Sequence, residues 1–168
     1  MLYAVVFALL ATSTLAASQR QYSFSPAVGS GSGAAYSITG QGRITAIRVW
    51  EHTGNLIYGL QFRYGLVWSP AVGPRYGSPS EMELYDGEAI IQVSGKYNNN
   101  VRAVMFTTNR GRTLYAGNLS GRSFNMYPTN PEAELCFISG RVQGALTSLA
   151  AHWAVVQSPI QSSNSTEA

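Results

Sequence analysis

Residues 89–111, AIIQVSGKYNNNVRAVMFTTNRG, read as two short β-strands joined by a polar turn. Ile91 and Val93 alternate with polar residues before the turn, and Val104 and Phe106 lie two apart after it, which is the period of a half-buried strand. The turn at 95–100 holds a glycine and three consecutive asparagines, residue types that tolerate the left-handed backbone angles of tight turns. The stretch is therefore predicted to be a β-hairpin.

Weak copies of this hairpin precede and follow it, at spacings of 44 and 45 residues. The matched positions form four columns: Val49, Val93 and Ile138; Leu60, Val104 and Leu149; Phe62, Phe106 and Ala151; and the small residues Gly59, Ala103 and Ser148. Three copies of one unit predict a threefold arrangement of similar sheets. The alternative is an all-β sandwich whose strands are evenly spaced.

The N-terminal stretch 1–17, MLYAVVFALLATSTLAA, carries no charged side chain and has a short apolar centre. That centre is well below the roughly 20 apolar residues that span a bilayer. Small residues follow it, so a secretory signal peptide is predicted at 1–17, with a buried N-terminal strand or helix as the alternative. A single domain is expected at 18–156, followed by a disordered Ser- and Asn-rich tail at 157–168. No later segment is apolar enough for a membrane span.

Composition agrees with a secreted β-protein. Charged residues make up only 11% of the chain, and its 11 basic residues never form a run, so no nucleic-acid partner is expected. The chain has one cysteine, Cys136, which cannot form an internal disulfide. Cys136 is expected to be a small buried apolar residue, an intermolecular bridge being the minor alternative.

The sequence offers no pattern for catalysis, a metal or a cofactor. The two histidines, His52 and His152, are isolated, and no pair of histidines or cysteines has metal-ligand spacing. Glu81 and Glu83 share a strand face, which is more typical of a solvated edge than of an acid–base pair. The chain is therefore predicted not to be an enzyme. Asn118 and Asn164 match the glycosylation sequon.

Five segments, in this order, are similar to jacalin-related lectins, and within that family to the vertebrate zymogen granule protein 16 group. They are GRITAIRVW (42–50), LQFRYGLVW (60–68), IIQVSGKY (90–97), RSFNMYP (122–128) and FISGRVQGALTSLAAHW (137–153). The resemblance covers about 22–156. It implies the β-prism I fold, with three four-stranded Greek-key sheets around a pseudo-threefold axis. It also implies metal-independent binding of glycans, often of the mannose type, and secretion, into the extracellular space or the lumen of secretory granules.

The resemblance also implies where a sugar would bind. The family's N-terminal glycine loop corresponds to Gly31, Ser32 and Gly33, and its recognition loop to Asn98, Asn99 and Asn100. The family's third loop, Gly-x-x-x-Asp, corresponds to Gln143, Gly144, Ala145, Leu146 and Thr147, so Gln143 replaces the glycine and Thr147 the aspartate. A shift by one residue restores the glycine but brings no carboxylate.

The missing carboxylate matters, because charge-assisted hydrogen bonds are worth roughly 1.5–3 kcal/mol each and neutral ones about half as much. We expect the Thr147 hydroxyl to point into a shallow pocket between the other two loops. Two hypotheses follow: a lectin with altered or weakened mannose specificity, or a non-catalytic protein that binds sulfated polysaccharide or granule matrix. The second would use scattered arginines: Arg43, Arg48, Arg63, Arg75, Arg102 and Arg141. The oligomeric state cannot be read from the sequence.

Overall fold

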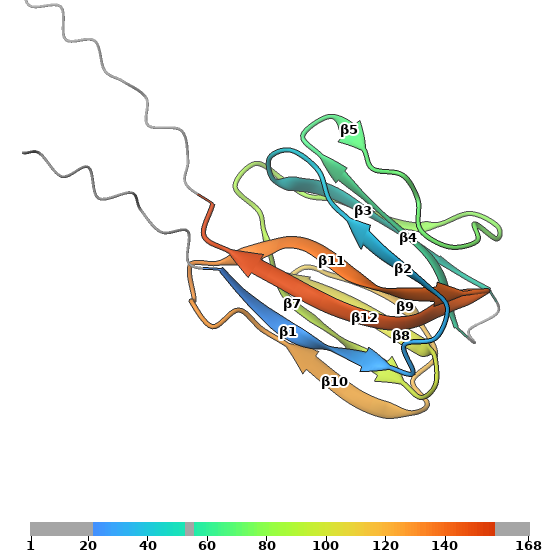
Figure 1. The fold of residues 1–168 in the computed structure, drawn as a ribbon. Coiled ribbons are helices and arrows are strands. Elements are labelled where there is room, and N and C mark those ends of the chain that lie inside the picture. The colour runs from blue at the N-terminus through green and yellow to red at the C-terminus, as the bar shows by residue number, and fades with distance from the viewer. Residues whose placement is uncertain (1–21, 53–55, 157–168) are drawn as a thin grey trace, which may run out of the picture.

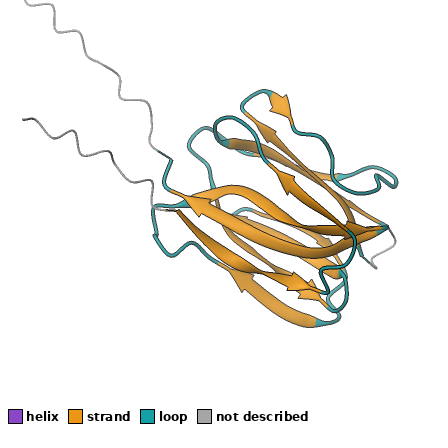
Figure 2. Cartoon of the chain, in the orientation of Figure 1, coloured by secondary structure: helices purple, strands orange, loops and turns teal. Residues whose placement is uncertain are grey.

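A computed structural model of the chain describes residues 22–52 and 56–156. The predicted signal peptide, the predicted tail and Asn164 lie outside the described residues. These residues form twelve β-strands, and the described part of the chain contains no helix (Figure 2). The strands are β1 (Tyr22–Gly29), β2 (Ala34–Ile38), β3 (Ile44–Glu51), β4 (Ile57–Tyr64), β5 (Val67–Trp68), β6 (Ser80–Glu83), β7 (Ile90–Tyr97), β8 (Val101–Thr108), β9 (Thr113–Gly117), β10 (Arg122–Met126), β11 (Glu134–Gln143) and β12 (Ala145–Ala154).

Three antiparallel four-stranded sheets make up the molecule, in the orders β1-β12-β11-β2, β10-β7-β8-β9 and β5-β4-β3-β6 (Figure 1). In each sheet a hairpin forms the two central strands, and two strands that are consecutive in the chain flank it on either side. For the hairpin β11–β12 these outer strands, β1 and β2, come from the other end of the chain. The predicted arrangement of three Greek-key sheets is confirmed.

The three sheets turn their apolar faces toward one common core. All nine residues of the three predicted apolar columns are fully buried, at 0% exposure. Phe62 and Phe106, from two different sheets, meet edge to face with 5.8 Å between ring centres, a favourable geometry for aromatic pairs. The repeat therefore reflects three sheets that contribute equivalent side chains to one core.

One predicted column is out of register. Val93 and Ile138 pair with Phe106 and Ala151, but in the first repeat the residue opposite Phe62 is Ile47 and not Val49. The reason is the first hairpin's turn, which has two more residues than the others between the equivalent pairs Trp50↔Gly59 and Lys96↔Ala103. The second-strand columns are correct, because the extra residues precede them.

Each hairpin carries a β-bulge at the same place. The pairing register shifts beside the turn of the hairpin, so that one residue at the start of its second strand has no partner on the first strand. These three bulge residues are Tyr58, Arg102 and Thr147. A bulge bends the strand and re-aims the residue it contains. The prism thus has three equivalent corners with different side chains.

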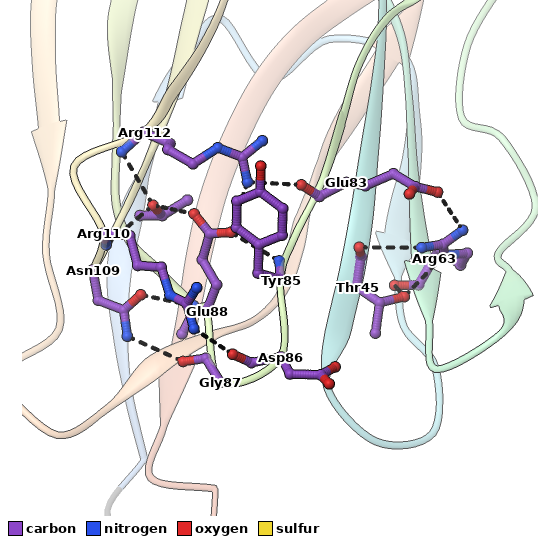
Figure 3. A network of polar contacts seen from close by, with 12 residues as sticks. Thr45, Arg63, Glu83, Tyr85, Asp86, Gly87, Glu88, Asn109, Arg110 and Arg112 are labelled. Carbon is purple, nitrogen blue, oxygen red and sulfur yellow. Dashed lines mark hydrogen bonds and ion pairs between the residues drawn. The ribbon is translucent and has the colours of Figure 1, made fainter.

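A polar network ties the loop before β7 to the turn between β8 and β9 (Figure 3). The buried carboxylate of Glu88 accepts hydrogen bonds from the Thr108 hydroxyl at 2.6 Å, the Tyr85 amide at 2.8 Å and Arg112 at 2.7 Å. Asn109 donates to the Gly87 carbonyl in the same network. The network fixes the boundary between two repeats.

One expectation about a single residue needs adjustment. Cys136 is half-buried, not buried, because the strand register shifts between Leu135 and Phe137. Glu81 and Glu83 are exposed on the edge strand β6, as expected of a solvated edge, and form ion pairs with Arg48 and Arg63 across the outer face of their sheet.

Candidate functional site

The loop at 29–33 links β1 to β2 and crosses the turn of the hairpin β11–β12. Gly29 and Gly33 have φ angles of 103° and 89°, which side chains other than glycine rarely adopt. A Cβ at Gly29 would lie 2.0 Å from the Thr147 carbonyl oxygen, and one at Gly33 would lie 2.3 Å from that of Val142. Both glycines are therefore needed for the loop to pack this closely on the hairpin.

The three predicted segments come together around this loop. The Ser30 amide donates to the Asn99 carbonyl at 3.1 Å, and the Gly31 amide makes a longer contact, 3.4 Å, to the Thr147 carbonyl. Arg141 also donates to the Gly33 carbonyl, at 2.9 Å. The glycine loop thus lies between the turn of the second hairpin and that of the third.

The predicted direction of the Thr147 hydroxyl is wrong. Thr147 is only 3% exposed, and its hydroxyl faces two backbone carbonyls, that of Ser32 at 2.5 Å and that of Arg141 at 3.0 Å. A hydroxyl donates one hydrogen at a time, so it is engaged in holding the loop on the hairpin. The bulge turns this side chain inward instead of into an open pocket.

The other predicted residues divide by exposure. Asn98, Asn99, Ser32, Gly33, Gln143 and Gly144 are exposed, Gly31 and Asn100 are half-buried, and Ala145 and Leu146 are buried with Thr147. The buried three can contribute to a ligand only through their backbone. The exposed set offers hydroxyl and amide groups, and the segments 30–33, 98–100 and 143–147 contain no charged residue. Neutral donors and acceptors of this kind suit hydroxyl groups better than ions.

Burial raises the pKa of Tyr36, which lies beside the site. Its hydroxyl, which like any tyrosine hydroxyl is protonated at physiological pH, donates to the Ser148 carbonyl at 3.0 Å. This bond supports the strand next to Thr147. Within 22–52 and 56–156, no three His, Cys, Asp or Glu side chains cluster in a way that could hold a metal ion.

A feature of the sequence that points to this loop is a glycine pattern. Gly29 and Gly33 recur as Gly73 and Gly77 and as Gly117 and Gly121, each pair 44 residues after the previous one, and all six have positive φ. A Cβ at Gly73 or Gly117 would lie 2.0 Å or 2.1 Å from the carbonyl of Tyr58 or Arg102. The pattern Gly-x-x-x-Gly therefore marks one crossing loop at each corner, and it is visible in the sequence alone.

The crossing loop at 117–121 contains the sequon residue Asn118. Its side-chain oxygen accepts a hydrogen bond from the Ser120 amide at 2.8 Å, and the neighbouring Leu119 is 71% exposed. The loop is thus an exposed turn. Asn118 as a glycosylation site stays a prediction.

Comparison with known proteins agrees with this architecture. The sequence pattern described as "Jacalin-like lectin domain" matches residues 25–152. The chain belongs to the jacalin-like lectin family. It is 42% identical to zymogen granule membrane protein 16 of Homo sapiens over 163 residues, which is 94% of this chain and 97% of that protein. It is also 35% identical to prostatic spermine-binding protein of Rattus norvegicus over 74% of this chain and 43% of that protein.

Solved structures show the same fold. A prostate-specific WGA16 glycoprotein lectin superposes with a TM-score of 0.71 at 28% identity, over 80% of this chain and all of that chain. Single-chain recombinant jacalin gives 0.69 at 22% identity, over 80% of this chain and 95% of that chain. This jacalin-like lectin is accordingly an all-β prism and a non-enzymatic protein. The described residues include no helix of the length and apolarity that crossing a membrane requires.

Proposed function

We propose that this jacalin-like lectin binds neutral glycans, of the mannose type or related to it, without a metal, at the crossing loop 29–33. The observation that carries the proposal is the convergence of three uncharged segments: Ser30 bonds to Asn99 and Gly31 contacts Thr147. The exposed groups around them, from Ser32, Asn98 and Gln143, are neutral hydrogen-bonding groups. A shallow surface of this kind can form hydrogen bonds with the hydroxyl groups of a sugar, and it binds a single sugar weakly.

The compartment is part of the proposal. Three relatives, from human, rat and mouse, are named zymogen granule membrane protein 16 and share 42% of their aligned residues with this chain. Together with the predicted signal peptide, their name supports a secreted protein of the secretory granule lumen or the extracellular space. Glycans of granule or cell-surface glycoproteins would be the partners there.

The alternative, binding of sulfated polysaccharide through scattered arginines, receives less support. Arg43, Arg48 and Arg63 are in ion pairs with Glu134, Glu81 and Glu83. Within the described residues only Arg75, Arg102 and Arg141 of the six arginines form no ion pair, and each belongs to a different corner. A dense basic stripe, which polyanion binding favours, is therefore not formed by this set.

A single substitution tests the site. Gly31→Asn places a side chain above the loop at a φ of 71°, which asparagine tolerates better than most residues. Its matched control is Gly111→Asn, at a φ of 74° and likewise on an open surface. Calorimetric titration with methyl α-mannopyranoside and with mannan should show binding to the wild type and the control and at least about tenfold weaker binding to Gly31→Asn. Equal binding by all three proteins would exclude the loop as the site.

A further inference from the structure

The outer face of the sheet β10-β7-β8-β9, the face turned away from the core, holds a pocket. Its volume is about 240 Å³, and its lining comes from all four strands and from Leu119 of the crossing loop 117–121. This is smaller than the roughly 300–1,000 Å³ of sites for drug-sized molecules. The pocket has room for one small ring. We call it the Ser94 pocket.

Ser94 is a buried polar residue with an unmet hydrogen bond. It is 3% exposed, and its hydroxyl oxygen, with less than 1 Å² accessible, has no hydrogen-bond partner among the described residues. Buried hydroxyls normally have a partner, because an unpaired one loses its water without compensation. The flexible side chain of Met105, directly opposite in the register, can move to give a ligand access.

The equivalent positions of the other two sheets are satisfied. Ser139, 45 residues after Ser94, hydrogen-bonds to the His152 ring at 2.7 Å. Arg48, which the register places at the same point of the first repeat, donates to Glu81 at 2.6 Å and lies 3.8 Å from the Trp68 ring centre. Two outer faces are thus filled by their own side chains, whereas the third keeps a pocket and an unpaired hydroxyl.

The walls of the Ser94 pocket differ in chemistry from one side to the other. Across the sheet, the outward row of paired residues reads Asn125, Ser94, Met105 and Tyr115. The half formed by β10 and β7 carries the polar side chains, among them Lys96, whose ammonium donates to Ser123 at 2.8 Å, and it also includes Phe124. The half formed by β8 and β9 is apolar and continues into Leu119, which is 71% exposed.

We propose that the Ser94 pocket is a second carbohydrate subsite that takes one pyranose ring. A pyranose has an apolar C–H face and an edge of hydroxyl groups, which match the two halves of the pocket. Its C–H face packs on Tyr115, Met105 and Leu119, and one ring hydroxyl supplies the missing partner of Ser94. The subsite lies on a different face from the loop 29–33 and depends on the proposed function only for the choice of sugars as probes.

The test is an NMR titration of the ¹⁵N-labelled protein with methyl glycosides of glucose, galactose, mannose and N-acetylglucosamine. Binding in the Ser94 pocket shifts the amide signals of Ser94, Met105 and Leu119, whereas binding at the crossing loop 29–33 shifts those of Gly31 and Asn99. We expect at least one glycoside to produce saturable shifts in the first set. The two sets report separately, so the subsite and the loop site can each fail without the other.

Two variants and a control assign the shifts. Ser94→Ala removes a hydroxyl that has no partner, so the melting temperature should stay unchanged or rise, while binding in the pocket weakens roughly three- to tenfold. Leu119→Ser removes an exposed apolar wall and should weaken it as well. The control is Thr107→Val, which alters the same face of β8 outside the pocket. Absence of shifts in the first set with all four glycosides, or shifts that both variants leave unchanged, would overturn the proposal.

Discussion

Thr147 has a structural role beside the proposed sugar site, where the family's third loop would carry an aspartate. Its hydroxyl donates to the Ser32 carbonyl at 2.5 Å, and this bond fixes the crossing loop against the hairpin. An acidic residue at this position could not donate to that carbonyl and would be repelled by it. The same residue that stabilises the loop therefore leaves the site without a carboxylate.

The exchange Thr147→Asp should make these two roles visible. The carboxylate is expected to turn away from the Ser32 and Arg141 carbonyls and toward the side of the loop where a sugar would bind. We predict a gain in mannoside affinity of at least about tenfold, some 1.4 kcal/mol, together with a loss of about 1 kcal/mol in the free energy of unfolding. Calorimetric titration and chemical denaturation measure the two effects on one sample.

The matched control for this exchange is Thr147→Asn. Its side-chain amide can still donate to the Ser32 carbonyl but carries no charge, so stability should change little and affinity should not rise. If Thr147→Asp loses stability with no gain in affinity, the carboxylate does not reach the sugar. If both variants gain equally, the charge is not what the site lacks.

At the level of elements, the sequence predicts the hairpins better than the loops between them. Alternation of apolar residues and the near-constant repeat identified the three hairpins, because core packing demands the same side chains in each sheet. The same repeat placed Val49 in the wrong column, because two extra residues in a turn do not change the alternation of apolar residues in the strands. The inward direction of the Thr147 side chain could not be predicted either, because a bulge depends on pairing between strands.

The polar network around Glu88 joins the loop that ends the first repeat to the turn between β8 and β9 of the second. Burial alone would raise the pKa of Glu88, but hydrogen bonds from Thr108, the Tyr85 amide and Arg112, with the charge of Arg112, outweigh burial and hold the pKa below its ordinary value. The pKa is thus lower in the folded chain than in the unfolded chain. Its contribution to stability is complete above the unfolded value, about 4.3, and is lost as the pH falls through the folded value.

Glu88→Gln should therefore lower stability in a pH-dependent way. At neutral pH we predict a loss of about 1.5–3 kcal/mol in the free energy of unfolding, since the hydrogen bonds involve a charged group. On acidification from about pH 6 to pH 3 the wild type should lose more stability than the variant, so that the two converge. Thermal melts across this range measure the difference; a gap that stays constant down to the lowest pH would contradict the role of the carboxylate.

The whole molecule repeats one unit three times but uses each copy differently. The corners carry Tyr58, Arg102 and Thr147 on a common backbone geometry. One outer face carries the ion pairs of Arg48 and Arg63, another carries aromatic rings stacked with His152, and the third carries the Ser94 pocket. The backbone symmetry follows from the shared core, which all three sheets must fill. The corners and outer faces are free of that demand, which is why their chemistry diverges and why the fold is easier to predict than the sites.

The charge of the whole molecule separates the two modes of binding. Net charge is +3 at pH 7, and charges on a protein surface are screened over about 10 Å at 0.1 M salt. If the crossing loop 29–33 binds neutral hydroxyl groups, affinity for mannan should change less than about twofold between roughly 50 and 300 mM salt. Binding to a polyanion would instead fall by orders of magnitude over such a range. Arg75→Gln, in an exposed loop away from the site, should leave mannan binding intact. A steep salt dependence of mannan binding, or its loss in Arg75→Gln, would instead identify the arginines as the binding groups.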